Sequence, residues 1–561
     1  MNDQIFWIVL KRLRAPFLVI IVTFSISIIG LILIPGLDDK GDIYHMSFFD
    51  AFYFVSYMAS TIGFGEAPYA FTYPQKIWVS GTIYLTVVGW FYAIGSIVSL
   101  VQDEALRKAI SRNRFRRQVL YLNEPFYIML GYNSIIKNII SRVGVDDYRF
   151  VVLDKDENKI DELVLENFYP HVPAIAADVT NQHMLKMAGI HRNNCFGVIS
   201  LFKDDTKNAQ IATICKLLNK KIDIIVRASS PRHLEHFKSM DLKHIQDPFD
   251  IVSKRIFYSI TAPHIWLLEM WAFGHSLKLR KRDLLPHGRY IVCGYGRMGK
   301  AIEKGLNKAG VEYIMYDIDS KGYQKEKGTT IYGDEEDVKK LIELGVKTSD
   351  CIVAATKDDL INLTLLNKAK QLNPNIFTIA RENSLDELTM FQAAKINRIY
   401  ILEKILADST YNYISKPLLD AFVKEVRKKD EQWGKVIVNM LSNMTGVNPD
   451  YFEVNIDEEN VYALSLKLSA GHNITLANIR RSRENRDELL HIVFLLLQRG
   501  EITYLIPDSS IELEIGDKLL VVADDENRED FEYIINNIYE LDYILGLDND
   551  NILLDNENLN K

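Results

Sequence analysis

The sequence predicts a helical membrane segment followed by two α/β domains with parallel sheets and a small α+β subdomain. Two apolar runs long enough to cross a bilayer lie within residues 1–101. Strand and helix patterns then alternate twice, over 121–280 and over 286–440, as in sheets wound with helices. Short alternating strands dominate 441–525, and a helix with a polar tail is expected over 526–561.

Length, charge and cysteine usage narrow the function classes. At 561 residues the chain is too long for a single core, so several domains are expected. The formal net charge of −8 provides no basic footprint, so no nucleic-acid partner is predicted. The cysteines are widely spaced without metal-ligand pairing, which is typical of a reducing compartment. They are Cys195, Cys215, Cys293 and Cys351.

The two apolar runs, 16–36 and 77–101, predict two transmembrane helices. Basic residues precede the first run, and a basic helical linker at 102–120 follows the second. Acidic residues outnumber basic ones between the runs, so the positive-inside rule places both termini in the cytoplasm. The sequence therefore predicts a multi-pass protein of the cell (inner) membrane, with the lipid bilayer as a partner.

The loop between the two runs is too apolar for a solvated connection. Residues 47–60 are rich in aromatic side chains and predict a short helix that dips back into the protein. The stretch Thr61-Ile62-Gly63-Phe64-Gly65 follows, and its two glycines permit positive φ, so successive carbonyls can turn toward one axis. Glu66 then places a carboxylate at the outer mouth. One such hairpin cannot enclose a pore, so symmetric assembly is required.

This stretch resembles the signature selectivity filter of potassium channels. The resemblance implies a homotetramer in which the carbonyls of residues 61–64, with the Thr61 hydroxyl, replace the hydration shell of K⁺. The sequence departs from the family pattern at Phe64 in place of Tyr, Glu66 in place of Asp, and Met58 where Thr is common. These departures leave a weakly selective cation channel as an alternative.

Two glycines in the second apolar run are candidates for a gating hinge. Gly89 and Gly95 weaken the helix locally and permit a bend, and Gly89 is favoured because of its position below the filter. The structural alternative is close helix packing, since small residues are common at helix interfaces in membranes.

The second α/β domain contains a dinucleotide-binding fingerprint. A strand at 289–293 runs into Gly294-Tyr295-Gly296-Arg297-Met298-Gly299, a helix follows at 300–309, and the next strand ends in Asp317. Gly294 permits the tight turn, Gly296 lets the backbone approach a pyrophosphate, and Gly299 brings the helix close to the strand.

The chemistry of this fingerprint suits a nucleotide. The helix N-terminus and Arg297 supply positive charge for phosphates, and Asp317 is placed to accept hydrogen bonds from ribose hydroxyls. NAD⁺ or NADH fits best as the cytosolic ligand, with ATP, ADP or AMP as alternatives. The structural alternative is a Rossmann scaffold that keeps its glycines for packing and binds nothing.

Residues beyond the fingerprint carry a second resemblance. Further strands are expected at 329–334, 350–355 and 375–381. The Gly333-Asp334 corner and the Ala355-Thr356-Lys357-Asp358-Asp359 stretch resemble the RCK domain, also called the TrkA N-terminal domain, a family that regulates K⁺ channels and transporters. Asp334 lies at the carboxyl end of a strand, beside the expected ligand crevice.

The first α/β domain parallels the second but lacks its later glycines. The strand at 126–130 leads to Gly131, and the strand at 151–154 ends in an acid. Asn133 and Ile136 stand where those glycines belong, which disfavours a close pyrophosphate approach. We expect this copy to serve a structural, force-transmitting role.

Two segments outside the sheets carry further expectations. Apolar residues at helical spacing predict a helix over 249–260, which the family uses to swap across paired domains. The alternative is an ordinary amphipathic surface helix. Near the C-terminus, the stretch at 516–522 resembles the TrkA C-terminal subdomain. Four strands are expected there, at 461–468, 491–499, 502–506 and 518–522.

A calcium site is a further candidate. The acidic cluster Glu335-Glu336-Asp337 suits Ca²⁺, as acidic sites do in some relatives, but solvated acids at a helix start are favoured. The tail at 548–551 briefly mimics an EF-hand loop and then departs from it. No metal ligand is therefore assigned.

The resemblance covers almost the whole chain, which is similar in layout to two-span potassium channels with tandem RCK domains of the GsuK type. It implies a non-enzymatic, ligand-gated K⁺ channel in which four subunits supply a cytoplasmic ring. A cytosolic nucleotide would bias that ring and pull the linker at 102–120. Two alternatives from other classes are a membrane-anchored NAD-dependent oxidoreductase and a regulatory subunit of a separate transporter.

Overall fold

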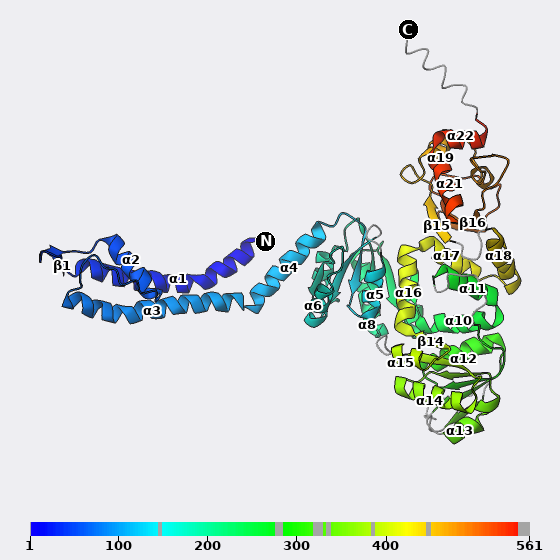
Figure 1. The fold of residues 1–561 in the computed structure, drawn as a ribbon, viewed down its shortest axis with the longest axis horizontal. Coiled ribbons are helices and arrows are strands. Elements are labelled where there is room, and N and C mark those ends of the chain that lie inside the picture. The colour runs from blue at the N-terminus through cyan, green and yellow to red at the C-terminus, as the bar shows by residue number, and fades with distance from the viewer. Residues whose placement is uncertain are drawn as a thin grey trace, which may run out of the picture. The chain divides into compact units, whose positions relative to one another are not determined.

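The computed structural model describes residues 2–143, 148–274, 284–317, 329–332, 338–382, 388–444 and 450–547 (Figure 1). The chain divides into two compact units. The first contains the N-terminal residues up to Asn123 together with residues 173–176 and 187–189, and the second contains the rest of the chain.

The N-terminal unit is built on two long apolar helices. Among the described residues, Leu10–Leu33 and Tyr73–Val101 are long and apolar enough to cross a membrane, with mean hydropathies of 2.7 and 1.8. Both predicted runs therefore form helices of membrane-spanning length, although the second begins four residues earlier than expected. The helices of this unit are α1 (Asn2–Leu33), α2 (Phe48–Ala59), α3 (Tyr73–Val101) and α4 (Glu104–Leu120).

Close packing joins α1 to α3. The Trp78 indole lies against Gly30, where an added Cβ would come within 2.0 Å of the ring. The Trp78 Nε1–H also donates to the Ser27 carbonyl at 3.2 Å. The short helix α2, predicted from the aromatic segment, lies beside both long helices, and Ser47 caps it by accepting from the Asp50 amide.

The first parallel sheet has the strand order β5-β4-β3-β6-β7-β8, with the first strand in sequence at its centre. Its strands are β3 (Phe126–Leu130), β4 (Arg149–Asp154), β5 (Ala174–Ala176), β6 (Cys195–Ser200), β7 (Asp223–Arg227) and β8 (His244–Gln246). Its helices are α5 (Ser134–Arg142), α6 (Glu157–Leu165), α7 (Gln182–Met187), α8 (Asp205–Leu218) and α9 (Pro231–Ser239), and α10 (Pro248–Thr261) and α11 (Pro263–Ala272) follow.

The second parallel sheet repeats this order as β11-β10-β9-β12-β13-β14, which confirms the predicted duplication. Its strands are β9 (Tyr290–Cys293), β10 (Tyr313–Asp317), β11 (Thr329–Tyr332), β12 (Cys351–Ala354), β13 (Phe377–Glu382) and β14 (Arg398–Ile401). Its helices are α12 (Arg297–Ala309), α13 (Val338–Glu343), α14 (Asp359–Leu372) and α15 (Leu388–Ala393), and α16 (Leu402–Ser415), α17 (Pro417–Val426) and α18 (Glu431–Met444) follow. We call these two sheets with their helices the first and second lobes.

The helices that follow each sheet cross to the other lobe. Helix α10 leaves the first sheet and packs along α12 of the second lobe, while α16 leaves the second sheet and packs along α5 of the first. The α10–α12 contact is close, since a Cβ on Gly305 would lie 2.7 Å from the Ser253 carbonyl oxygen. The helix predicted over 249–260 is therefore confirmed, and it is exchanged between lobes of the same chain.

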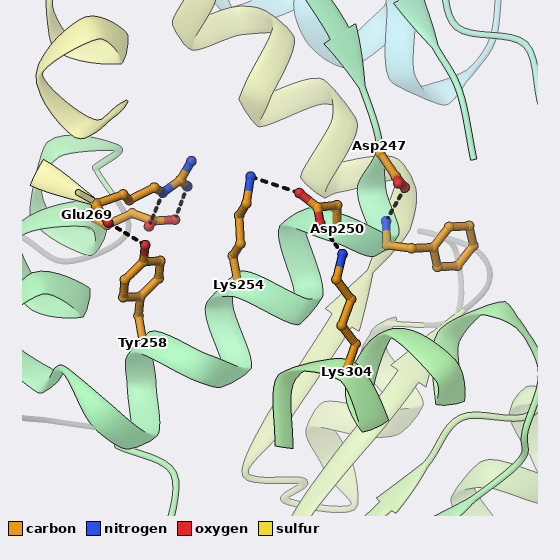
Figure 2. A network of polar contacts seen from close by, with 8 residues as sticks. Asp247, Asp250, Lys254, Tyr258, Glu269 and Lys304 are labelled. Atoms are coloured by element: carbon orange, nitrogen blue, oxygen red, sulfur yellow. Dashed lines mark hydrogen bonds and ion pairs between the residues drawn. The ribbon is translucent and has the colours of Figure 1, made fainter. Parts of the chain in front are cut away.

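Ion pairs fix these crossing helices (Figure 2). Asp250 of α10 binds Lys254 on its own helix and Lys304 of α12, each at 2.8 Å. Burial raises the pKa of Asp250, but the two ammonium groups outweigh it and hold that pKa at about 2. Farther along, Glu269 of α11 accepts two hydrogen bonds from Arg427, and the Tyr258 hydroxyl donates to the Arg427 carbonyl at 2.6 Å.

The C-terminal subdomain is an antiparallel sheet of order β15-β18-β16-β17 covered by helices. One predicted strand is wrong: residues 462–468 lie in a helix, in which Ala463, Leu464 and Ser465 are buried and Val461 is the N-cap. The strands are β15 (Asp450–Asn455), β16 (Val493–Arg499), β17 (Ile502–Leu505) and β18 (Lys518–Ala523). The helices are α19 (Tyr462–Ser469), α20 (Leu476–Ile479), α21 (Asp525–Asn536) and α22 (Ile538–Leu545).

Candidate pore and nucleotide sites

The loop after α2 adopts the backbone that the sequence predicts for a pore-lining strand. Thr61, Gly63 and Gly65 have φ values of 62°, 66° and 75°, so residues with positive φ alternate along the loop with Ile62 and Phe64, whose φ is not positive. The loop starts from the C-terminal end of α2, where the Tyr57 carbonyl accepts from the Ile62 amide at 3.1 Å and from the Gly63 amide at 3.4 Å. In the single chain the side chains of Ile62 and Phe64 are exposed.

Two tyrosines of α2 hold the far end of this loop. The Tyr57 hydroxyl donates to the Glu66 carbonyl at 2.6 Å, and the Tyr53 hydroxyl donates to the Glu66 carboxylate at 3.2 Å. Phe64 has no hydroxyl, unlike a Tyr at this position, so the loop is held by the tyrosine hydroxyls of α2 instead. Sequence reasoning missed both residues, although their i, i+4 spacing on a short helix places them on one face.

The two hinge candidates differ in their surroundings. Helix α3 is continuous through both. Gly89 is buried against α1, and a Cβ there would lie 3.0 Å from the Thr23 Oγ1. A Cβ on Gly95 would meet no atom within 4 Å. In this conformation Gly89 has a packing role, whereas Gly95 contacts none of the described side chains closely.

The fingerprint of the second lobe folds as a tight turn between β9 and α12. Gly294 has a φ of 96°, and a Cβ there would lie 2.9 Å from the Ala355 carbonyl carbon. A Cβ on Gly299 would lie 2.0 Å from the Gly294 carbonyl oxygen, so the helix start presses on the turn. Gly296 is the N-cap of α12, and a Cβ there would meet no atom within 4 Å. Of these three glycines, Gly296 is the one with open space beside it among the described residues.

The remaining fingerprint side chains contact their own turn and the helices next to it. The Asp317 carboxylate accepts a hydrogen bond from the Tyr295 amide. The Tyr295 hydroxyl donates to the Glu303 carboxylate at 2.7 Å. Arg297 stacks its guanidinium over the Phe249 ring at 5.1 Å, while Met298 is buried. The predicted ligand Asp334 and the acidic cluster at 335–337 lie outside the described residues, as does the tail at 548–551.

Sequence reasoning missed an asparagine that organises the crevice. Asn362 of α14 accepts from the Thr356 amide at 3.0 Å and donates to the Arg381 carbonyl at 3.0 Å, so it joins the ends of β12 and β13. Asn208 makes the equivalent bonds in the first lobe, to Phe202 and Arg227. Each of these two helices begins after a capping Asp and contains an Asn in its early turns. This shared pattern was visible in the sequence.

Two arginines lie at equivalent places near the ends of β7 and β13. Arg227 is the last residue of β7 and is buried, Arg381 is the last but one of β13 and is half-buried, and the Nε of each has no hydrogen-bond partner among the described residues. Burial lowers the pKa of both guanidinium groups, and the nearby charge of Arg297 lowers each pKa further. Such a concentration of cations favours an anionic ligand.

Metal and thiol chemistry have little support in the part of the chain that the structure describes. No group of three or more His, Cys, Asp or Glu residues within it is placed to hold a metal ion. The cysteines are buried, and no disulfide joins them. Burial raises the pKa of the Cys195 and Cys215 thiols to about 12, which keeps them unreactive.

Comparison with known proteins points to the same regions. Residues 127–248 and 290–402 match the family of TrkA-N domains, and these segments coincide with the two lobes. Potassium channel protein 1 of Methanocaldococcus jannaschii is 27% identical over 283 residues, which are 50% of this chain and 78% of that protein. Probable potassium channel protein 2 of the same organism is 28% identical over 148 residues, 25% of this chain and 43% of its own length.

A solved structure has a similar extent. The GsuK channel covers 94% of this chain and 99% of its own, at 15% sequence identity and a TM-score of 0.49.

Proposed function

We infer that this chain, in which two TrkA-N domains follow a two-helix membrane segment, belongs to the potassium channels with RCK domains. Its function is that of a ligand-gated K⁺ channel subunit. The observation that carries this proposal is the loop at 61–65, where left-handed residues alternate beneath a short helix and between two membrane-length helices. The similarity to potassium channel protein 1 supports the same ion.

Four copies are needed for this function. A K⁺ filter is a ring of backbone carbonyls, and one chain contributes a single filter loop. We therefore propose a homotetramer in the cell (inner) membrane with both termini in the cytoplasm. Ile62 and Phe64, exposed in the single chain, would be covered by neighbouring subunits. Thr61 and its carbonyl neighbours would bind the ion, and Glu66 would stand at the outer mouth.

The first test is the reversal potential of currents from the purified protein in a planar bilayer, with K⁺ on one side and Na⁺ on the other. We expect a reversal close to the K⁺ equilibrium potential. A reversal near zero would assign the pore to the weakly selective class, and an absence of current would point to a regulatory subunit.

The proposed gating ligand is a cytosolic nucleotide in the second lobe. The open N-terminus of α12 at Gly296 suits a phosphate, because its first amides point outward and carry partial positive charge. Arg297 and Arg381 add full charges nearby, and Asp317 lies where a ribose would be held. NAD⁺ or NADH fits these groups, as do ATP, ADP and AMP. Ligand binding changes gating only if its affinity differs between two shapes of the ring.

Replacing Gly296 with Asp is expected to weaken the channel's response to NAD⁺ or ADP by at least about tenfold, because a carboxylate would repel the phosphates and displace their hydrogen bonds. Since a Cβ at Gly296 meets no neighbouring atom, folding should be unaffected. The half-saturating concentration is read from single-channel open probability, with the thermal midpoint as the folding control. A normal response in Gly296→Asp and in Asp317→Ala would refute the site.

Replacing Gly89 with Ala is expected to reduce the open probability, because alanine removes the freedom of glycine to bend at a proposed hinge. The same variant also meets the Thr23 Oγ1, so a Thr23→Ala background separates the two effects. We expect the loss to persist there. Recovery of opening with Thr23→Ala, but not with Thr23→Ser, would assign Gly89 to helix packing and leave Gly95 as the hinge candidate.

A further inference from the structure

Equivalent positions of the two lobes can be compared side chain by side chain. The two lobes share one strand order, and each receives a crossing helix from the other. Gly131, Asp154 and Asn208 of the first lobe make the same local contacts as Gly294, Asp317 and Asn362 of the second. The differences therefore lie in what occupies the space around a shared framework.

In the second lobe this space is left to a ligand. The N-cap of α12 is Gly296, and no side chain caps the helix. Thr356, a small residue, follows β12, and its hydroxyl donates to Asn362 at 2.8 Å. The crossing helix α10 presents Phe249, which carries no charge and supports the Arg297 guanidinium.

In the first lobe the N-terminus of α5 is capped by its own sequence. Asn133 occupies the position of Gly296, and its Oδ1 accepts from the Ile136 amide at 3.1 Å. An amide that would bind a phosphate in the second lobe is thus already bonded.

The turn before α5 is also covered. The Phe202 ring lies over Gly131, and a Cβ on Gly131 would come within 2.6 Å of that ring. Phe202 follows β6 as Thr356 follows β12, and the Lys207 ammonium lies over this ring at 3.5 Å from its centroid. The ring therefore fills the place where a ligand would approach the glycine.

A side chain of the second lobe places a negative charge at the start of α5. Glu403, in the first turn of the crossing helix α16, accepts a hydrogen bond from the Ser134 hydroxyl at the start of α5. The Lys203 ammonium lies 3.0 Å from the same carboxylate, and the Glu403 side chain is only 16% exposed. Glu403 corresponds to Phe249 of α10, so this one position carries a carboxylate at one crossing and an uncharged ring at the other.

We propose that Glu403 acts as a built-in surrogate for a ligand phosphate in the first lobe, and that each chain binds one nucleotide, in the second lobe alone. The assignment of that nucleotide rests on the proposed function. The surrogate itself rests on the Ser134–Glu403 and Phe202–Gly131 contacts. Glu403 keeps the phosphate position of the first lobe permanently occupied, so only the second lobe responds to nucleotide in the cytosol.

The number of sites tests the first half of the proposal. Calorimetric titration of the full-length channel in nanodiscs with ADP is expected to give one site per chain, and none in Gly296→Asp. Two sites in the wild-type protein, or one remaining in Gly296→Asp, would overturn it. If ADP and NAD⁺ both fail to bind the wild-type protein, the nucleotide assignment of the proposed function fails, and the surrogate is judged by the second experiment.

Chemical rescue tests the surrogate without any nucleotide. Glu403→Ala removes the carboxylate and leaves room for an anion, so its thermal midpoint should fall and then rise with added inorganic phosphate, by more than the wild-type midpoint does. Glu403→Gln fills the same space, so phosphate should give no additional rise.

A matched control lies on the same helix pair. Asp408 of α16 binds Arg142 near the end of α5. Asp408→Ala should therefore lower the thermal midpoint, but added phosphate should not protect the start of α5. Hydrogen exchange of the Ser134–Ile136 amides measures that protection. Equal protection of these amides by phosphate in all three variants, or no rescue of Glu403→Ala, would refute the surrogate.

Discussion

Replacing Gly63 with Ala is expected to abolish K⁺ current through the assembled channel. Gly63 has a φ of 66°, and an L-residue pays about 1–2 kcal/mol to adopt the left-handed region. Because every subunit would contribute this strain to one ring, the loop should relax toward negative φ and turn its carbonyls away from the pore axis. A Cβ at Gly63 meets no atom within 4 Å in the chain, so the loss would arise in the backbone.

A glycine outside the filter provides the control. Gly81 of α3 also has no atom within 4 Å of an added Cβ, and its φ is not positive. Gly81→Ala should retain both current and selectivity in the same bilayer recording. If Gly63→Ala passed K⁺ as the wild-type protein does, the loop at 61–65 would not be the filter.

Replacing Glu269 with Ala is expected to cost about 3–5 kcal/mol of folding stability, which is typical when one partner of a buried ion pair is removed. Glu269 is 1% exposed, and its oxygens lie 2.9 and 2.7 Å from two nitrogens of Arg427. Burial lowers the pKa of Arg427, but Glu269 more than offsets this and raises it. Without Glu269 the guanidinium would lose the charge that compensates its burial.

The measurement is the unfolding midpoint of the full-length protein, followed by tryptophan fluorescence because Trp266 and Trp271 lie on the same helix. The double variant Glu269→Leu, Arg427→Leu removes both charges and should recover much of the loss. A single variant as stable as the wild-type protein would show that this pair does not hold α11 to the segment after α17.

Local features of the fold were predictable because their determinants are close together in the sequence. The fingerprint from Gly294 to Asp317 specifies a strand, a turn, a helix and a strand within one short segment, and the structure has these elements in that order. The membrane helices follow from composition alone. The positive φ values at Gly63 and Gly65 follow from the residue type.

Contacts between distant segments were not predictable in this way. Ser134 and Glu403 are far apart in the sequence, and nothing near Glu403 distinguishes it from a solvated acid at a helix start. Residues 461–468 illustrate another limit. Their leucines alternate, which is typical of a strand. The segment nevertheless forms a helix, so Leu464 is buried against the surrounding sheet and helices while Leu466 is exposed.

The exchange of α10 and α16 between the lobes determines where the protein can be divided for expression. A fragment ending after α11 would contain the whole first sheet, yet it would expose Val252 and Ile256 of α10, which are fully buried in the complete chain. It would also leave α5 without α16. Soluble fragments for crystallisation or titration should therefore keep residues 124–547 together, although the sequence between the sheets looks like a natural place to cut.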